Sequence, residues 1–144
     1  MPGSELIGHE ERKEIEKVFN SGGILYRQGF ENQRDDCYQV RKFEEKFSSF
    51  LGGQDCLAVT SGTAALRVAL AALDICPGDE VITQSFTFVA TVEAIVESGA
   101  IPICANIDET LNLDPLQFEK LINSKTKAVI LSLIHISEPT RPLS

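Results

Sequence analysis

Two stretches near the start of the chain carry apolar residues at helical spacing. In residues 9–20, Ile15, Val18 and Phe19 fall on one side of an otherwise charged segment, which predicts an amphipathic helix. Residues 38–51 predict a second helix, and we expect its apolar stripe to pack into a core: Val40, Phe43, Phe47, Phe50 and Leu51. A glycine pair follows each helix and ends it.

Further along, short apolar runs alternate with helical patterns. Strands are predicted at residues 57–59, 81–84, 101–105 and 127–130, and the segments between them predict helices, the first ending near residue 73 and the others at 89–98 and 115–122. Asp114 caps the last of these helices, and Pro115 suits its first position. This alternation predicts an α/β fold with a mostly parallel sheet and helices on both faces.

Composition narrows the class of protein. The chain has 144 residues, of which 43% are hydrophobic and 24% charged, as in a soluble globular domain. A net charge of −8 argues against nucleic acid or an anionic membrane surface as the main partner. No apolar run approaches the ~20 residues of a membrane span, and the first residues do not form a secretion signal. The sequence therefore predicts a cytoplasmic protein.

Metal and nucleophile chemistry has little support in the sequence. The four cysteines form no C-x-x-C pair, so we expect reduced thiols and no metal site: Cys37, Cys56, Cys76 and Cys104. Neither His9 nor His135 stands in a context that supports a catalytic triad. Three acidic pairs are interpreted as solvated faces or turns: Asp35-Asp36, Glu44-Glu45 and Asp79-Glu80.

The junction between the first predicted strand and its helix suits an anion. Small hydroxyl residues and Gly62 stand where the first N–H groups of the helix have no intrahelical partner. Ser61 or Thr63 can cap the helix or bind a phosphate oxygen, although an ordinary capped helix explains the same residues. The usual dinucleotide and P-loop fingerprints are missing. Phe88, after the next strand, is either a core aromatic or a ring that stacks on a planar cofactor such as pyridoxal phosphate.

Several linked motifs make the interpretation more specific. Residues 61–66 (SGTAAL), 77–83 (PGDEVIT), 85–91 (SFTFVAT) and 99–102 (GAIP) occur in this order, with 43–47 (FEEKF) before them and 125–130 (KTKAVI) after them. Over about residues 8 to 130 the chain thus resembles the DegT/DnrJ/EryC1/StrS family of sugar aminotransferases.

The resemblance implies a fold, a cofactor and a reaction. It implies part of the large domain of a type I aminotransferase, preceded by N-terminal helices, in a homodimer with active sites at the subunit interface. The family uses pyridoxal phosphate to transfer an amino group from glutamate or glutamine to a keto sugar linked to a nucleotide. By position, Gly62, Thr63 and Ala64 match the segment that holds the cofactor phosphate, and Phe88 matches the ring-stacking residue. Tyr26 and Arg27 fall in the stretch that approaches the substrate.

The sequence also departs from the family pattern. Asn106 stands where members usually have an acidic residue. The family's Schiff-base lysine, and the aspartate that pairs with the pyridine nitrogen, lie downstream of these motifs, and neither Lys125 nor Lys127 stands in the right context. We therefore expect an N-terminal fragment, about a third of a member, that lacks a catalytic residue and is inactive alone. The alternatives are a family member that dehydrates sugars and a non-catalytic α/β module.

The last residues have a character of their own. Residues 131–144 resemble the in-frame translation of a transposase sequencing adapter, so we expect a read-through tail after Ile130 rather than a divergent C-terminus. We accordingly divide the chain into an N-terminal helical segment (1–53), a partial cofactor-binding domain (54–130) and this tail. Its apolar start, residues 131–134, is predicted to prolong the last strand, and residues 138–142 to lack regular structure.

Overall fold

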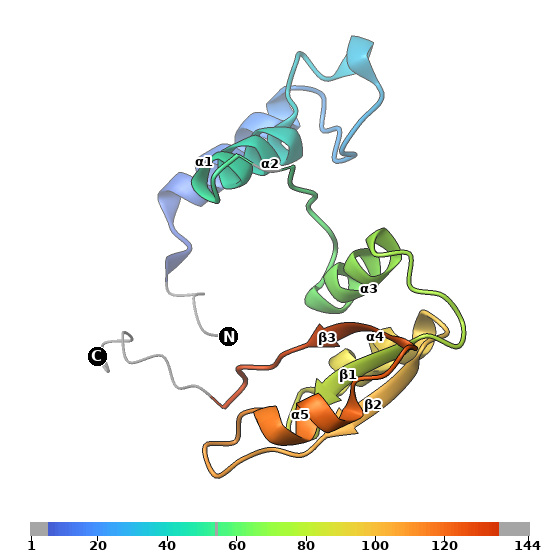
Figure 1. Cartoon of the computed structure of the whole chain (residues 1–144). Helices are drawn as coiled ribbons and strands as arrows, with labels where there is room; N and C mark the ends of the chain where they lie inside the picture. The colour runs from blue at the N-terminus through green and yellow to red at the C-terminus, as the bar shows by residue number, and fades with distance from the viewer. Residues whose placement is uncertain (1–5, 54, 136–144) are drawn as a thin grey trace. The chain divides into compact units, whose positions relative to one another are not determined.

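The structure, a computed structural model, describes residues 6–53 and 55–135 (Figure 1). Residue contacts divide the chain into two compact units, Met1–Ala58 and Val59–Ser144. The division falls five residues after the boundary that the sequence suggests. Each unit is described by itself.

The first unit is helical. It contains α1 (His9–Asn20), the short 3₁₀ helix η2 (Glu31–Gln33) and α2 (Gln39–Phe50). Both predicted α-helices are confirmed, with ends that differ from the prediction by at most one residue. At the start of α1 the Glu11 carboxylate accepts a hydrogen bond from the Gly8 N–H at 2.8 Å, which satisfies a backbone group that the helix leaves free.

The segment between α1 and α2 folds back closely on the end of α1. Gly22 has φ +104°, and a Cβ placed there would lie 2.1 Å from the carbonyl oxygen of Gln33. A side chain at this position is therefore excluded both by its backbone conformation and by space. The glycine allows the loop after η2 to approach the end of α1.

The apolar stripe of α2 does not form a core. Phe43, Phe47 and Phe50 are exposed by 54%, 41% and 84%, and the buried residue of the helix is Glu44. The expectation that the stripe packs into a core is wrong for the described residues, because no other element of this unit covers that face. Among the described residues of the unit, the buried side chains are those of Arg34 and Glu44.

The second unit contains a parallel sheet. Its strands are β1 (Glu80–Gln84), β2 (Ile101–Ala105) and β3 (Thr126–Ile130), in the order β2-β1-β3. Both neighbours run parallel to the central strand β1. These strands confirm the predictions at 81–84, 101–105 and 127–130.

Three helices accompany the sheet: α3 (Gly62–Ala72), α4 (Val89–Glu97) and α5 (Pro115–Leu121). The chain moves from β1 to β2 in one direction and from β2 to β3 in the other, so right-handed crossovers place α4 and α5 on opposite faces. Figure 1 agrees, with α5 in front of the sheet and α4 behind it. The predicted α/β fold is confirmed, including the Asp114 cap of α5, whose carboxylate accepts from the Leu116 N–H at 2.8 Å.

The apolar core of this unit lies where α3 and α4 meet the sheet. Three partly buried side chains, those of Leu66, Ala128 and Ile130, pack against it. The core itself is formed by six buried side chains: Leu70, Ile75, Val81, Ala94, Ile95 and Ala100. Burial of these apolar surfaces is the main stabilising contribution of the unit.

Two predicted strand segments are absent. Residues 57–59 have no regular structure, and the Ala58 N–H donates to the Glu44 carboxylate at 2.9 Å instead of to a neighbouring strand. Residues 131–134 do not prolong β3, because β1 ends at Gln84 and the Ser132 N–H donates to the Gln84 side chain at 3.1 Å. The prediction for residues 138–142 lies outside the described residues.

The expectation of reduced cysteines agrees with the structure, in which all four are free; Cys37 and Cys56 are half-buried, and Cys76 and Cys104 are exposed. In the described ranges, no helix has both the length and the apolar character needed to cross a bilayer.

Candidate functional site

The start of α3 presents backbone donors to solvent. Ser61 has an extended backbone, and its hydroxyl accepts a hydrogen bond from the Ala64 N–H at 3.1 Å, so Ser61 is the cap that the sequence left open between two residues. Among the described residues, nothing accepts a hydrogen bond from the N–H groups of Gly62 and Thr63. These two donors point out of the positive end of the helix, where an anion is stabilised.

The space in front of this turn is open. A Cβ added at Gly62 would meet no other atom within 4 Å, and Gly62 itself is exposed. A ligand can therefore approach the backbone without displacing a side chain. Thr63 and Ala64 are half-buried, so their side chains lie against the unit while their peptide groups begin the helix.

Phe88 lies at the start of α4, after the turn that follows β1. Its ring is 63% exposed, so in the described chain it is not the core aromatic that the alternative interpretation supposed. The turn before it is fixed, because the Gln84 amide donates to the Phe86 carbonyl at 3.0 Å. A hydroxyl–hydroxyl hydrogen bond between Thr87 and Thr91 at 3.1 Å adds to this. The structure thus places the exposed Phe88 ring next to a turn that side-chain hydrogen bonds hold in place.

The lysines near β3 lie at the other end of the sheet from this turn. The Lys125 carbonyl accepts from the Glu80 N–H at 2.8 Å, at the amino end of β1, whereas Phe88 follows the carboxyl end. Asn106, which departs from the family pattern, follows β2, and its carbonyl accepts from the Asp114 N–H at 3.0 Å. In the described residues its backbone therefore supports the start of α5.

Tyr26 and Arg27 differ in what they offer. The Tyr26 ring is 69% exposed and stacks on Phe30 with ring centroids 5.4 Å apart. The Arg27 guanidinium makes a two-point ion pair with Glu44, in which Nη2 lies 2.9 Å from Oε2 and Nε lies 2.9 Å from Oε1. The structure brings Arg27 to Glu44, which the sequence did not identify as its partner.

Glu44 is the residue that sequence reasoning missed. It is only 5% exposed, whereas its neighbour Glu45 is exposed, so the interpretation of this pair as a solvated face is wrong for Glu44. The hydrogen bonds from Arg27 and from the Ala58 N–H hold the pKa of the Glu44 carboxyl below its ordinary value. The signal was its position: at helical spacing Glu44 lies on the same face as Val40 and Phe47, and a carboxylate inside an apolar stripe needs a partner.

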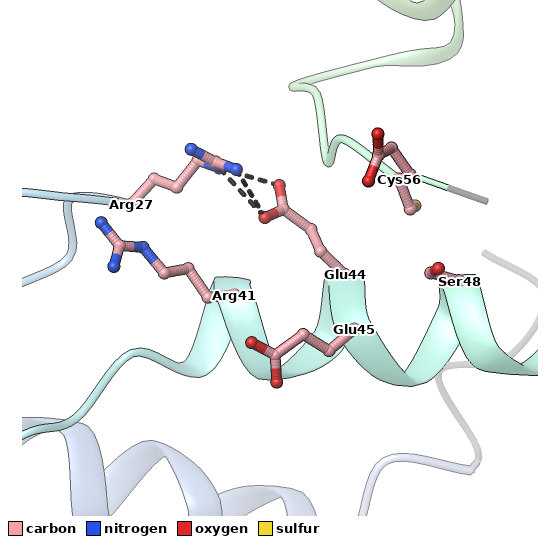
Figure 2. Close-up of a pocket in the computed structure, with 7 residues that line it drawn as sticks. Arg27, Arg41, Glu44, Glu45, Ser48 and Cys56 are labelled. Atoms are coloured by element: carbon pink, nitrogen blue, oxygen red, sulfur yellow. Dashed lines mark hydrogen bonds and ion pairs between the residues drawn. The ribbon is translucent and has the colours of Figure 1, made fainter. Parts of the chain in front are cut away.

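A cavity of about 240 Å³ opens beside this ion pair, within the first unit (Figure 2). Its lining carries both signs of charge: Arg27, Arg41, Glu44, Glu45, Ser48, Asp55 and Cys56. In the second unit an apolar cavity of about 340 Å³ lies near Gln84, Phe118 and Val129. Neither cavity is lined by Gly62, Thr63 or Phe88.

The residues present fit two parts of pyridoxal phosphate. Free backbone donors at a helix start suit its phosphate, and the open space at Gly62 gives that group room. The exposed ring of Phe88 suits one face of the pyridine.

The sequence of this chain matches one aminotransferase family and several known proteins. A family model for the DegT/DnrJ/EryC1/StrS aminotransferase family matches residues 6–136. The chain is 42% identical over 126 residues to the spore coat polysaccharide biosynthesis protein SpsC of Bacillus subtilis, which covers 87% of this chain and 30% of SpsC. It is 43% identical over 93 residues to UDP-2-acetamido-2-deoxy-3-oxo-D-glucuronate aminotransferase of Pseudomonas aeruginosa, covering 64% of this chain and 26% of that protein.

Solved structures agree with these relatives. An aminotransferase from Psychrobacter cryohalolentis superposes with a TM-score of 0.73 at 32% identity, over 87% of this chain and 30% of that one. NtdA of Bacillus subtilis, solved with bound cofactor PMP, gives a TM-score of 0.67 at 30% identity, over 90% of this chain and 29% of that one. The chain thus spans about a third of the length of the proteins that it matches.

Proposed function

Because the chain belongs to the DegT/DnrJ/EryC1/StrS aminotransferase family, we propose that it is part of a pyridoxal-phosphate enzyme that transfers an amino group to a keto sugar linked to a nucleotide. The observation that carries this proposal is the start of α3. There the Ser61 hydroxyl caps the helix through the Ala64 N–H and leaves the N–H groups of Gly62 and Thr63 for an anion. A phosphate ester suits such donors at the positive end of a helix.

Each residue of the site has a proposed role. Gly62, Thr63 and Ala64 hold the phosphate of the cofactor, and the Phe88 ring lies against the face of its pyridine. Bound pyridoxal phosphate supplies the electron sink that amino-group transfer needs. The chain's own contribution would be to bind and orient the cofactor, with the turn holding its phosphate and the Phe88 ring facing its pyridine. A lysine from outside these residues is needed for the proton transfers.

The relatives support the class of substrate. The Pseudomonas aeruginosa relative carries a nucleotide-linked keto sugar in its name, and SpsC is named for polysaccharide biosynthesis. We infer glutamate or glutamine as the amino donor, a homodimer as the active assembly and the exposed Tyr26 ring as part of the substrate side. Four free thiols favour a reducing, cytoplasmic location.

The reaction is tested with the complete gene product that contains this chain. It is loaded with pyridoxal phosphate and incubated with nucleotide-linked 3-keto and 4-keto sugars and either glutamate or glutamine. Mass spectrometry should detect an amino sugar that carries the donor's nitrogen. Loss of water from the sugar without gain of nitrogen would instead identify a dehydratase, and no change with any pair would contradict the proposal.

The cofactor site is tested on the 144-residue chain with Gly62→Ala. The added methyl group enters open space, so the helix keeps its stability, but the methyl group occupies the position that the phosphate approaches. We expect weaker binding of pyridoxal phosphate, measured by its fluorescence, and unchanged binding of pyridoxal, which has no phosphate. If the substitution weakens the binding of both ligands equally, this turn does not bind the phosphate. A stable, borohydride-trappable adduct at a single lysine of this chain would contradict the expectation that the fragment is inactive alone.

A further inference from the structure

We propose that Gln84 is a positioning residue for Phe88, because its buried side chain fixes the turn that carries the Phe88 ring. Gln84 is the last residue of β1, and Phe88 stands four residues later, directly before α4. Every contact that carries the proposal lies within the second unit. The proposal rests on the function proposed above, since it makes Gln84 responsible for the orientation of the ring that faces the pyridine of the cofactor.

The Gln84 side chain is buried, and its polar atoms are engaged. Gln84 is 1% exposed. Its Nε2 donates to the Phe86 carbonyl at 3.0 Å and to the Leu111 carbonyl at 3.3 Å, and its Oε1 accepts from the Ser132 N–H at 3.1 Å. Both N–H donors of the amide are therefore used. Because a buried amide loses free energy when it lacks such partners, these contacts fix the orientation of the side chain.

The three partners of Gln84 belong to three different loops. Phe86 lies in the turn after β1, Leu111 lies between β2 and α5, and Ser132 follows β3. The strands are parallel, so the three loops leave the sheet at the same edge (Figure 1). This carboxyl edge is where ligands bind in parallel sheets. Gln84 thus joins the loops at the edge where a cofactor is expected.

The contact with Leu111 keeps the Gln84 amide directed at the turn. Leu111 has φ +65°, a backbone conformation that leucine rarely adopts. Its N–H donates to the Asp108 carbonyl at 3.0 Å, and its carbonyl accepts from Gln84. These two hydrogen bonds offset the cost of the conformation and hold the Leu111 carbonyl in place. With one N–H bound there, the other N–H of the amide points to Phe86.

The path from Gln84 to Phe88 is short. Gln84 fixes the carbonyl of Phe86, two residues before Phe88. The Phe88 carbonyl accepts a hydrogen bond from the Thr91 N–H at 3.0 Å, in the first turn of α4. The backbone is therefore held on both sides of Phe88, whereas the ring itself is exposed. The direction of this ring depends on its backbone more than on packing.

The test compares Gln84→Met with Thr83→Val in the 144-residue chain. Methionine keeps the length and the apolar stem of Gln84 but loses its three hydrogen bonds. Thr83 is the matched control, because it is equally buried on the same strand. Its hydroxyl donates to the Ile130 carbonyl at 2.9 Å, so T83V also loses a buried hydrogen bond, but one that leads to β3 instead of the turn.

NMR and cofactor binding provide the readouts. In Q84M we expect faster hydrogen exchange at the Ser132 N–H and shifted ring signals of Phe88, and in T83V neither change. Signals of α3 report whether the second unit remains folded. Pyridoxal phosphate and pyridoxal should both bind Q84M about two- to twelvefold more weakly, since at most one aromatic stacking contact is lost.

A double substitution separates positioning of the ring from a general effect on the fold. In Phe88→Ala the ring is absent, so adding Q84M should weaken the binding of pyridoxal no further. If Q84M weakens binding equally with and without the ring, or if it leaves the Phe88 signals unchanged, the proposal is wrong.

The wild-type chain supplies a measurement that does not depend on whether Q84M folds. Its Gln84 side-chain amide protons should exchange slowly with solvent, and by ¹⁵N relaxation residues 86–88 should be as ordered as β1. If residues 86–88 are mobile on this timescale, Gln84 does not fix the turn. If the wild type binds neither pyridoxal phosphate nor pyridoxal, the proposed function fails, while the order of residues 86–88 still decides the role of Gln84.

Discussion

The two units of the chain bury different kinds of side chain. In the second unit six buried side chains form an aliphatic cluster between α3, α4 and the sheet, and Thr83, Gln84 and Thr91 are buried as well. In the described part of the first unit, the buried side chains are an arginine and a glutamate, while the aromatic rings of α2 are exposed. Apolar burial sums many small contributions, whereas the structure of the first unit depends on a few directional contacts.

This difference matters for how each unit responds to mutation and to pH. The second unit provides the open turn and Phe88 on a sheet whose geometry the core fixes. The first unit contains the ion pair of Arg27 with Glu44, and the Glu44 carboxylate also accepts a hydrogen bond from the Ala58 N–H. We therefore expect volume changes to damage the second unit and charge or pH changes to damage the first.

The largest expected effect is from Ile95→Ala. Ile95 is 0% exposed in the core cluster, and its truncation removes apolar contacts and leaves a cavity. We expect the free energy of unfolding of the second unit to fall by about 2–5 kcal/mol, measured by urea denaturation with β1 amide exchange as the local probe. Val96→Ala is the matched control: Val96 is 56% exposed on the same helix, and its loss should cost less than about 0.5 kcal/mol. Equal effects would contradict the apolar core as the basis of this unit.

A smaller effect is expected from removing the cap of α3. Ser61→Ala deletes the acceptor of the Ala64 N–H and should cost about 1 kcal/mol. Ser61→Asp restores the cap and should recover the stability, but its negative charge should repel the cofactor phosphate. Thermal denaturation and pyridoxal phosphate fluorescence measured on both variants separate the two roles. If S61D binds the cofactor as the wild type does, the phosphate does not lie at this turn.

Much of the fold could be predicted because it is local. Periodicity, the Asp114–Pro115 start of α5 and the glycine ends set the boundaries of the helices to within about one residue. The segment 57–59 shows the limit of such reasoning. It has the composition of a strand, but a strand needs a neighbour, and the Ala58 N–H is bound to a side chain instead.

The candidate site could be predicted only in part, for a related reason. The cap of α3 could be narrowed to Ser61 or Thr63, because both residues lie next to the predicted start of the helix. The contacts of Glu44 with Arg27 and with the Ala58 N–H join residues 17 and 14 positions apart, and they depend on a loop path that Gly22 and Arg34 make possible. Sequence spacing does not encode such a path.

The pH dependence of the first unit should reveal the ion pair between Arg27 and Glu44. The hydrogen bond from Arg27 contributes most to lowering the Glu44 pKa, followed by that from the Ala58 N–H. A depressed carboxyl pKa stabilises the folded state above the ordinary value of 4.5, and this stabilisation is lost as the pH falls through the lower folded value. Because Arg27 is 41% exposed at its side chain, water screens the pair and the effect is modest.

Carboxyl-carbon NMR of Glu44 provides the measurement. We expect its titration midpoint below 4.5 in the wild type and a higher midpoint in Arg27→Ala. The positive charge of Arg41 acts in the same direction as Arg27, and Glu45 and Asp55 line the same cavity. For this reason Glu45→Ala is the control and should leave the order of the two midpoints unchanged. If the Glu44 titration midpoint does not change in Arg27→Ala, the ion pair does not form in solution.

The smallest effect on stability is expected for Phe88→Ala, and this variant best separates the two kinds of side chain in the second unit. A phenylalanine in the core would cost several kcal/mol on truncation, but Phe88 is 63% exposed. We expect less than about 0.5 kcal/mol here, measured under the same denaturation conditions as Ile95→Ala. Binding of both pyridoxal phosphate and pyridoxal should weaken together, because the ring contacts the pyridine that both ligands contain. If only the binding of pyridoxal phosphate weakens, or if the free energy of unfolding falls as much as in Ile95→Ala, Phe88 does not act by ring stacking.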